Sequence, residues 1–224
     1  AAPGRYHLYK LRTEGKSAVV INAEGTPDIR PEQDEYGVAK VDKIVSKPQG
    51  GYCIVDLYGT YHRDAESYRR GIRFSENRRA FTIQDEIVTK KNTAKVHWSV
   101  NTPARINISG DGKTAVLDKD GEKMFAQIKA PANAKFSERA ADYLEGEEFP
   151  LSRNTPHAAS KLAIDLQDVA EVTISVDFIP LDGGIDAPEV TPPAVTPMAE
   201  WNIPDGPLIK EEKPALDDIK INGT

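Results

Sequence analysis

The stretch RRAFTIQDEIVTKKNTAKVHWSVNTPARINISGDG, residues 78–112, holds three apolar-alternating runs separated by turn-forming residues. The alternating apolar residues are, run by run, Phe81, Ile83 and Ile87; Val96, Trp98 and Val100; and Ile106 and Ile108. Side chains two apart on a strand share a face, so this pattern predicts antiparallel strands with one face on a core and one in water. Pro103 and the SGDG of residues 109–112 supply the breaks. The stretch therefore predicts a three-stranded meander at the centre of an all-β domain.

Further strand-length runs lie on both sides of this stretch. The predicted strands cover residues 6–11, 17–23, 38–47, 52–58, 67–74, 114–117, 122–129, 133–140, 161–166 and 172–179. KDGE at residues 119–122 is typical of a hairpin turn. No stretch shows convincing helical periodicity. The predicted fold is thus a large antiparallel β-sandwich of stacked sheets with about a dozen strands.

The composition changes after Pro180, and we divide the chain into a sandwich over residues 1–181 and a Pro-rich extended arm over residues 182–224. PEVTPPAVTP favours an extended polyproline conformation. This segment is either a flexible linker or an ordered arm lying on the sandwich, and we favour the ordered arm. Its candidate anchors are Trp201, Ile203 and Leu208. The final LDDIKINGT resembles the first strand of a further module.

Composition and charge narrow the possible partners. The chain has 224 residues, 39% of them hydrophobic and 29% charged, with a mean hydropathy of -0.51. No apolar run approaches the roughly 20 residues of a membrane helix. The net charge of -6 and the pI of about 5.4 argue against general nucleic-acid binding, which needs a basic surface. We predict neither a membrane nor a nucleic acid as a partner.

Positive charge is nevertheless clustered in one region. The cluster consists of Arg69, Arg70, Arg73, Arg78, Arg79, Lys90, Lys91 and Lys95. We favour the interpretation that these are solvated, outward positions of two strands. The alternative is a local basic stripe that faces a polyanion, such as an acidic polysaccharide.

Sequence-local catalytic and metal motifs are not found. The four histidines are His7, His62, His97 and His157, and none forms an H-x-H or H-E-x-x-H pair. No G-x-S-x-G, Walker or Rossmann motif occurs. Cys53 is the only cysteine, so no internal disulfide is possible, and we predict a small buried hydrophobe there. We predict no metal and no cofactor.

Three residues of the opening stretch carry specific expectations. Trp98 is predicted in the core, and its neighbour His97 on the outer face as a candidate ligand contact. Asp85 shares the face of the apolar residues of its run, so we predict that it is partly buried and paired with one of the clustered arginines. Structural pairing is favoured over acid–base catalysis there. Tyrosines that could act as general acid or base near an anionic sugar are Tyr6, Tyr9, Tyr58 and Tyr61.

The order of several motifs adds a family resemblance. YHLYKLRTEGKSAVVIN, residues 6–22, resembles the pattern Y-Y-x-x-R-x-E-G-H-N-T-L-V-I-N of heparinase II/III-like polysaccharide lyases, and IVDLYGTY, residues 54–61, is similar to their D-L-T-x-A-Y. RRGIRF, RRAFTIQDEI, VHWSVNTPARINISGDGKTAVL and KLAIDLQDVAEVTISVDFIPL then follow the family's order. Each motif is weak alone; their succession over about residues 5–181 carries the resemblance.

The resemblance implies a fold and an activity. Members have an N-terminal α/α-toroid and a C-terminal β-sandwich, and they cleave uronic-acid polysaccharides such as heparin, heparan sulfate or alginate by β-elimination. A base removes the C5 proton and an acid protonates the leaving oxygen. The family's catalytic Asn, His and Tyr lie mostly on the toroid, and its H-x-H-L-D-A-G-like strand should lie upstream of Ala1. The resemblance therefore implies no catalytic residue in this chain, a toroid as partner domain, and a periplasmic or extracellular location.

One position departs from the family. The histidine of E-G-H-N-T, often a metal ligand there, corresponds to Lys16 in EGKSA. A protonated lysine cannot coordinate a cation, so Lys16 would instead bind a substrate carboxylate, pair with an acid, or simply lie on the surface. We take Lys16, Arg78 and His97 as the candidate substrate contacts.

The predicted function is that of the C-terminal β-domain of a lyase. Such a domain would form one wall of the cleft for an acidic polysaccharide and would be inactive alone. The alternative is a non-catalytic carbohydrate-binding or structural module.

Overall fold

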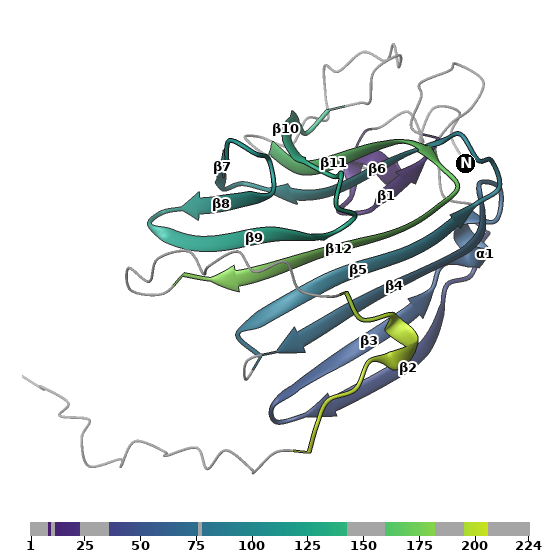
Figure 1. Cartoon of the computed structure of the whole chain (residues 1–224), viewed down its shortest axis with the longest axis horizontal. Helices are drawn as coiled ribbons and strands as arrows, with labels where there is room; N and C mark the ends of the chain where they lie inside the picture. Colours follow the sequence, from purple (N-terminus) through teal and green to yellow (C-terminus); the bar gives the residue numbers. More distant parts are fainter. Residues whose placement is uncertain are drawn as a thin grey trace, which may run out of the picture.

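The chain folds into two antiparallel β-sheets packed face to face (Figure 1). The computed structural model describes residues 9, 12–22, 36–75, 78–142, 160–181 and 195–205. In these residues there are twelve strands, so the predicted all-β sandwich of about a dozen strands is confirmed. None of the helices among them has the length and apolar character needed to cross a membrane.

The larger sheet has eight strands. In spatial order they are β2 (Lys40–Lys47), β3 (Gly50–Asp56), β4 (Ala65–Ser75), β5 (Ala80–Thr89), β12 (Glu171–Pro180), β9 (Glu122–Ala130), β8 (Thr114–Lys119) and β7 (Arg105–Ile108). The predicted hairpin over residues 119–122 joins β8 to β9. Its two central residues, Asp120 and Gly121, have φ of 56° and 91°, the left-handed values that a two-residue hairpin turn requires.

The smaller sheet has four strands. In spatial order they are β1 (Val19–Ile21), β6 (Ala94–Thr102), β11 (Ser160–Val169) and β10 (Phe136–Ala140). A single helical turn, α1 (Tyr58–Tyr61), follows β3, although the predicted strand over residues 52–58 extended into it. The strand predicted over residues 6–11 is not seen at Tyr9, which lies in a 3-10 turn; the rest of it falls outside the described residues.

The prediction that the opening stretch forms one meander is wrong. β5 and β7 belong to the larger sheet, whereas β6 between them in sequence lies at the centre of the smaller one. Alternation tells which side chains of a strand are buried, but not which strand is its neighbour. The chain crosses the sandwich after Thr89, so Asp85 of β5 and Trp98 of β6 face each other across the core.

The main core lies between the two sheets. Trp98, Leu162 and Ile164 of the smaller sheet pack against apolar side chains of β4, β5 and β12 in the larger one, and all three are fully buried. The predicted face of β12 contributes Ile174, Val176 and Phe178 as buried members, with Val172 partly buried against them. Phe178 stacks on Phe81 with ring centroids 4.8 Å apart.

The smaller sheet leaves β2 and β3 uncovered. Of the described residues, no buried member of the main core comes from these two strands. Cys53 of β3 is therefore only partly buried, which corrects the prediction of a buried cysteine. On the same face, Ile44 is 67% exposed and Ile72 39% exposed.

A second, smaller core lies on the other face of β3 and β4. Residues 195–205 of the C-terminal arm cross this face, and Met198, Trp201 and Ile203 pack on Tyr52 and Ile54 (Figure 1). Tyr52 donates its hydroxyl hydrogen to the Trp201 carbonyl at 2.8 Å. The ordered arm is thus confirmed for this segment, with Trp201 and Ile203 as anchors; Leu208 lies outside the described residues.

Candidate functional site

The three predicted substrate contacts do not come together. Arg78 lies in the β4–β5 turn of the larger sheet with φ 68°, and its guanidinium donates to Ser46 Oγ and to the Lys47 carbonyl, each at 2.8 Å. These bonds tie the β4–β5 turn to the β2–β3 turn. Lys16 and His97 lie elsewhere: Lys16 is exposed in the segment just before β1, and His97 lies on β6 of the smaller sheet.

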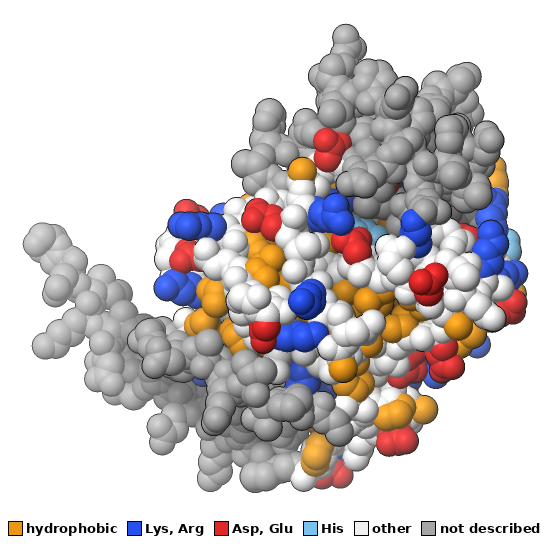
Figure 2. All heavy atoms as spheres, turned by 45° about the horizontal axis from the view of Figure 1, so that its top comes forward, with side chains coloured by type: hydrophobic (Ala, Val, Ile, Leu, Met, Phe, Trp, Pro, Cys, Tyr) orange, Lys and Arg blue, Asp and Glu red, His pale blue; other side chains and the backbone are white. Residues whose placement is uncertain are grey.

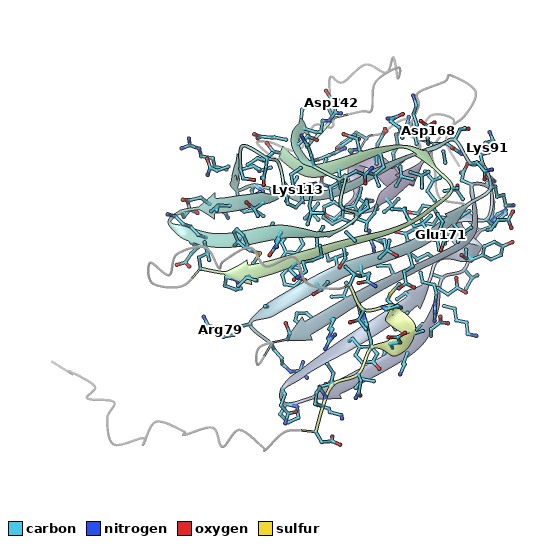
Figure 3. The ribbon with its side chains drawn as sticks, in the orientation of Figure 1. Arg79, Lys91, Lys113, Asp142, Asp168 and Glu171 are labelled. Atoms are coloured by element: carbon cyan, nitrogen blue, oxygen red, sulfur yellow. The ribbon has the colours of Figure 1, made fainter. Side chains whose placement is uncertain are left out.

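The basic cluster does not form one stripe. Arg69 pairs with Asp42 at 2.8 Å, and Arg70 points inward to the core rather than to water. Arg79 and Lys91 lie at opposite ends of β5 (Figure 3). On the face drawn in Figure 2, Lys and Arg side chains are interspersed with Asp and Glu. The favoured interpretation of solvated outward positions is therefore wrong for Arg70.

Asp85 is the centre of a buried hydrogen-bond network. Its Oδ1 accepts from Tyr68 Oη at 2.8 Å and from Arg70 Nε at 2.7 Å. Its Oδ2 accepts from Arg70 Nη2 at 2.9 Å and from Trp98 Nε1 at 3.0 Å. The predicted pairing of Asp85 with a clustered arginine is confirmed. Since the carboxylate is fully buried and accepts four hydrogen bonds, it joins the two sheets and is unsuited to reach a substrate.

The ionisation of this network follows from its burial. Burial disfavours the charged guanidinium of Arg70, but the negative charge of Asp85 outweighs this effect and raises the Arg70 pKa above its usual value. Burial also raises the pKa of Tyr68 well above its usual value. Arg70 therefore keeps its charge and Tyr68 its proton at physiological pH.

His97 lies on the face of the smaller sheet opposite to the core, as predicted, but it is buried there, with 1% of its surface exposed. Its Nδ1 lies 2.7 Å from Asp165 Oδ1 on the neighbouring strand β11, and Arg139 Nη2 donates to Asp165 Oδ2 at 2.8 Å. Because a carboxylate only accepts, Nδ1 carries the hydrogen. Burial would raise the pKa of Asp165, but the hydrogen bonds from His97 and Arg139 outweigh it and lower this pKa to about 2.

Around His97 the outer face of the smaller sheet carries a layer of polar side chains, which we call the polar layer; His97, Ser99 and Lys161 in it are buried. We use this name for His97, Ser99, Asn101, Ser137, Lys161 and Asp165. They occupy alternate positions of β6, β11 and β10, on the face opposite to the core. Four of their atoms are buried with no hydrogen-bond partner among the described residues: His97 Nε2, Ser99 Oγ, Asn101 Oδ1 and Ser137 Oγ. A buried polar atom left without a partner costs about 1–3 kcal/mol, so such a set is unusual in a folded domain.

The N-terminal segment brings further titratable groups to this layer. Lys161 is 1% exposed, and its Nζ lies 5.1 Å from the centre of the Tyr9 ring and 3.3 Å from the Asp142 carbonyl. Burial lowers the pKa of Lys161 to about 8, against the raising effect of Glu14 and Asp142. Burial raises the pKa of Tyr9 well above its usual value. Near neutral pH Lys161 is therefore close to its titration point, beside a tyrosine that keeps its proton, and both side chains are buried.

The segment before β1 is fixed along the edge of the layer. Asn101 donates its side-chain Nδ2 to the Gly15 carbonyl at 3.0 Å, and its backbone N–H to Ser17 Oγ at 3.0 Å. Lys16 lies between these two contacts and is exposed. Arg12 pairs with Glu14 at 2.7 Å, with both side chains buried. Lys16 is thus an exposed cation at the edge of the polar layer.

The three candidate tyrosines that the structure describes, Tyr9, Tyr58 and Tyr61, do not come together. Tyr61 is buried and donates to the Val19 carbonyl at 2.8 Å, whereas Tyr58 is 43% exposed on α1. Tyr9 alone lies beside the polar layer, and Tyr6 is outside the described residues. Within the described part of the chain, no group of three or more His, Cys, Asp or Glu side chains could hold a metal ion.

Lys161 and Asp165 were missed by the sequence analysis. For KLAIDL the sequence predicted only a strand, in which Lys161, Ala163 and Asp165 share the face opposite to the apolar residues. Only the register that pairs Asp165 with His97 reveals their association, and a single sequence does not contain that register.

Two comparisons with known proteins were made for the whole chain. No family model matches it, and no curated protein matches it.

Proposed function

We propose that this chain is the C-terminal β-sandwich of a polysaccharide lyase that cleaves uronic-acid polysaccharides by β-elimination. In this role it lines one wall of the cleft for the acidic polysaccharide, while the reacting groups belong to a toroid domain. The protein then works in the periplasm or outside the cell. The observation that carries the proposal is the position of the EGKSA segment, which is part of the family resemblance. This segment lies along the edge of the polar layer, where Gly15 and Ser17 bond to Asn101.

Charge at the edge of the layer supports this assignment. Lys16 is exposed, and the Arg139 side chain is 46% exposed although it pairs with Asp165. Two cations with exposed side chains beside the polar layer suit a polymer that carries carboxylates. The overall charge of -6 repels a polyanion, so attraction must come from such a local site.

The uncovered apolar face of the larger sheet supports a partner domain. Ile44, Cys53 and Ile72 lie side by side on β2, β3 and β4, and Phe74 continues the strip with 39% of its surface exposed. Soluble proteins rarely expose a contiguous apolar patch without using it for an interaction. Docking of the toroid domain on this strip would cover it.

The test combines turnover and binding. The purified chain is mixed with alginate, heparin and neutral dextran, and the absorbance of unsaturated uronate is followed. We expect no turnover, and retardation of the protein in gels that contain the anionic polymers but not dextran. Lys16→Gln and Arg139→Gln should reduce the retardation, whereas the control Lys91→Gln, an exposed lysine on the β5–β6 connection, should not.

Two outcomes would contradict the proposal in different ways. Turnover by the chain alone would place reacting groups within it. If Lys16→Gln and Lys91→Gln were retarded equally, the edge of the polar layer would not be the binding surface.

The second candidate function is a carbohydrate-binding or structural module. It is favoured by Lys16, which stands at the position of the family's metal-binding histidine. Glycan binding by a full-length protein that cleaves nothing would support it.

A further inference from the structure

A pocket lies between the arm and the outer face of the larger sheet, on the opposite side of the sandwich from the polar layer. Its volume is about 150 Å³, the size of cavity that takes one six-membered ring. We call it the arm pocket; its walls include Arg73, Gln84, Lys129, Ser175, Asp177 and Trp201. The first five come from β4, β5, β9 and β12, and the sixth from the arm.

The arm pocket has an excess of one positive charge. Asp177 uses both carboxylate oxygens: Oδ1 accepts from Thr82 Oγ1 at 2.6 Å, and Oδ2 lies 3.2 Å from Lys129 Nζ. Lys129 has three N–H groups, so two are available for another acceptor. Arg73 donates one N–H to the Asn202 carbonyl at 3.2 Å. The pocket therefore holds two cations, Arg73 and Lys129, and one carboxylate, Asp177. Each oxygen of that carboxylate already has one partner.

Arg73 has an unmet hydrogen-bonding requirement. Its Nε is buried and has no hydrogen-bond acceptor among the described residues. In water this N–H would donate to a water molecule, and burial has removed that acceptor. An anion in the pocket would accept hydrogen bonds from the same guanidinium. A single negative charge balances the pocket, whereas a dianion would be repelled by Asp177.

The remaining walls suit a hydroxylated ring. Trp201 is fixed by its Nε1–H, which donates to the Thr196 carbonyl at 3.1 Å, and by an edge-to-face contact with Tyr52 at 5.8 Å. Gln84 is held by its Nε2, which donates to the same carbonyl at 3.0 Å. Ser175 adds a hydroxyl to the wall opposite to the arm. The aromatic surface and the polar groups are thus set in place before a ligand arrives.

We propose that the arm pocket binds a small hydroxylated monocarboxylate, a sugar acid of one ring. Its carboxylate lies between Arg73 and Lys129, and its ring lies beside Trp201. This site does not depend on the proposed lyase function, because it shares no residue with the polar layer.

The test uses the full chain and two probes, glucuronate and glucose, which differ in one carboxylate. Binding is measured by calorimetry at fixed ionic strength and by the fluorescence of Trp201, with the core Trp98 as a constant background. We expect saturable binding of glucuronate and at least roughly tenfold weaker binding of glucose, as the loss of a charged hydrogen-bond acceptor implies. Arg73→Gln and Lys129→Gln should each weaken glucuronate binding roughly tenfold or more.

Lys91→Gln is the matched control, since it removes one lysine charge at the far end of β5 and should leave binding unchanged. Lys129→Gln is needed beside Arg73→Gln because only Arg73 also bonds to the arm. Equal binding of glucose and glucuronate, no binding of either, or a loss confined to Arg73→Gln would overturn the proposal. So would an equal loss in Lys91→Gln.

Discussion

Replacing Asp85 with asparagine tests the network that joins the two sheets. The carboxylate accepts two hydrogen bonds from Arg70, one from Tyr68 and one from Trp98. An asparagine keeps one oxygen, and its amide N–H groups would face two of these donors. The Arg70 side chain is only 17% exposed, so it would also lose its counter-charge in the interior.

Removing one partner of a buried ion pair costs about 3–5 kcal/mol, because the other charge is left uncompensated. We expect a loss of this size in the free energy of unfolding for Asp85→Asn. The free energy is measured by urea unfolding, followed by the fluorescence of Trp98 and by circular dichroism. The free energy of unfolding of a typical domain is about 5–15 kcal/mol, so such a loss is a large fraction of it.

Asp42→Asn is the matched control, because it makes the same substitution in a pair that faces water. Asp42 lies 2.8 Å from Arg69, and the two side chains are 24% and 38% exposed. A pair of this kind contributes about 0–1 kcal/mol. The joint replacement Asp85→Leu with Arg70→Met removes both buried charges and should recover part of the loss, since Tyr68 and Trp98 still lack their acceptor. A cost of Asp85→Asn no greater than that of Asp42→Asn would refute the reasoning.

Three further substitutions test other parts of the fold. Gly71→Ala should lower the free energy of unfolding by about 1–3 kcal/mol and release the arm, because an added Cβ would lie 2.6 Å from the Trp201 ring. A red shift of Trp201 fluorescence would confirm the release. Gly110→Ala is the control and should leave the fluorescence unchanged, because nothing lies within 4 Å of a Cβ added there. Gly121→Ala should cost roughly 1–2 kcal/mol in urea unfolding, since φ is 91° there and no neighbour lies within 4 Å. The pKa of Lys161 is lowered to about 8, so the unfolded state binds more protons between pH 8 and pH 10, and stability should rise over this range. Lys161→Met should abolish that rise in urea titrations at successive pH values, and an unchanged rise would contradict the assignment.

The strands were predictable because their alternation is local. The faces of β5, β6 and β12 follow from side chains two apart, and the turn at Asp120 and Gly121 follows from the preference of such residues for left-handed backbone. The assignment of strands to sheets was not predictable in this way. β6 pairs with β1 and β11, which lie far from it in the sequence, and no local pattern specifies such partners.

The candidate site was predicted only in part for the same reason. The pairing of Asp85 with an arginine could be inferred, because a carboxylate on an apolar face needs a partner. The burial of His97 was not predicted, because a polar face was taken to be a wet one. His97, Ser99 and Lys161 are instead buried, and His97 pairs with Asp165 from a strand that begins 58 residues after β6 ends, Ser160 against Thr102. The helical turn α1 was also not predicted, because a segment of four residues is too short to show helical periodicity.

The topology of the smaller sheet has a consequence for how the protein folds. Its strands β1, β6, β11 and β10 come from four separate parts of the chain, whereas β2 to β5 are sequential antiparallel neighbours in the larger sheet. Closing long loops before their contacts form is entropically unfavourable, so structures with many distant pairings fold slowly. We expect the β2–β5 hairpins to form early, and the smaller sheet to assemble in the rate-limiting step, when Trp98 docks against Asp85.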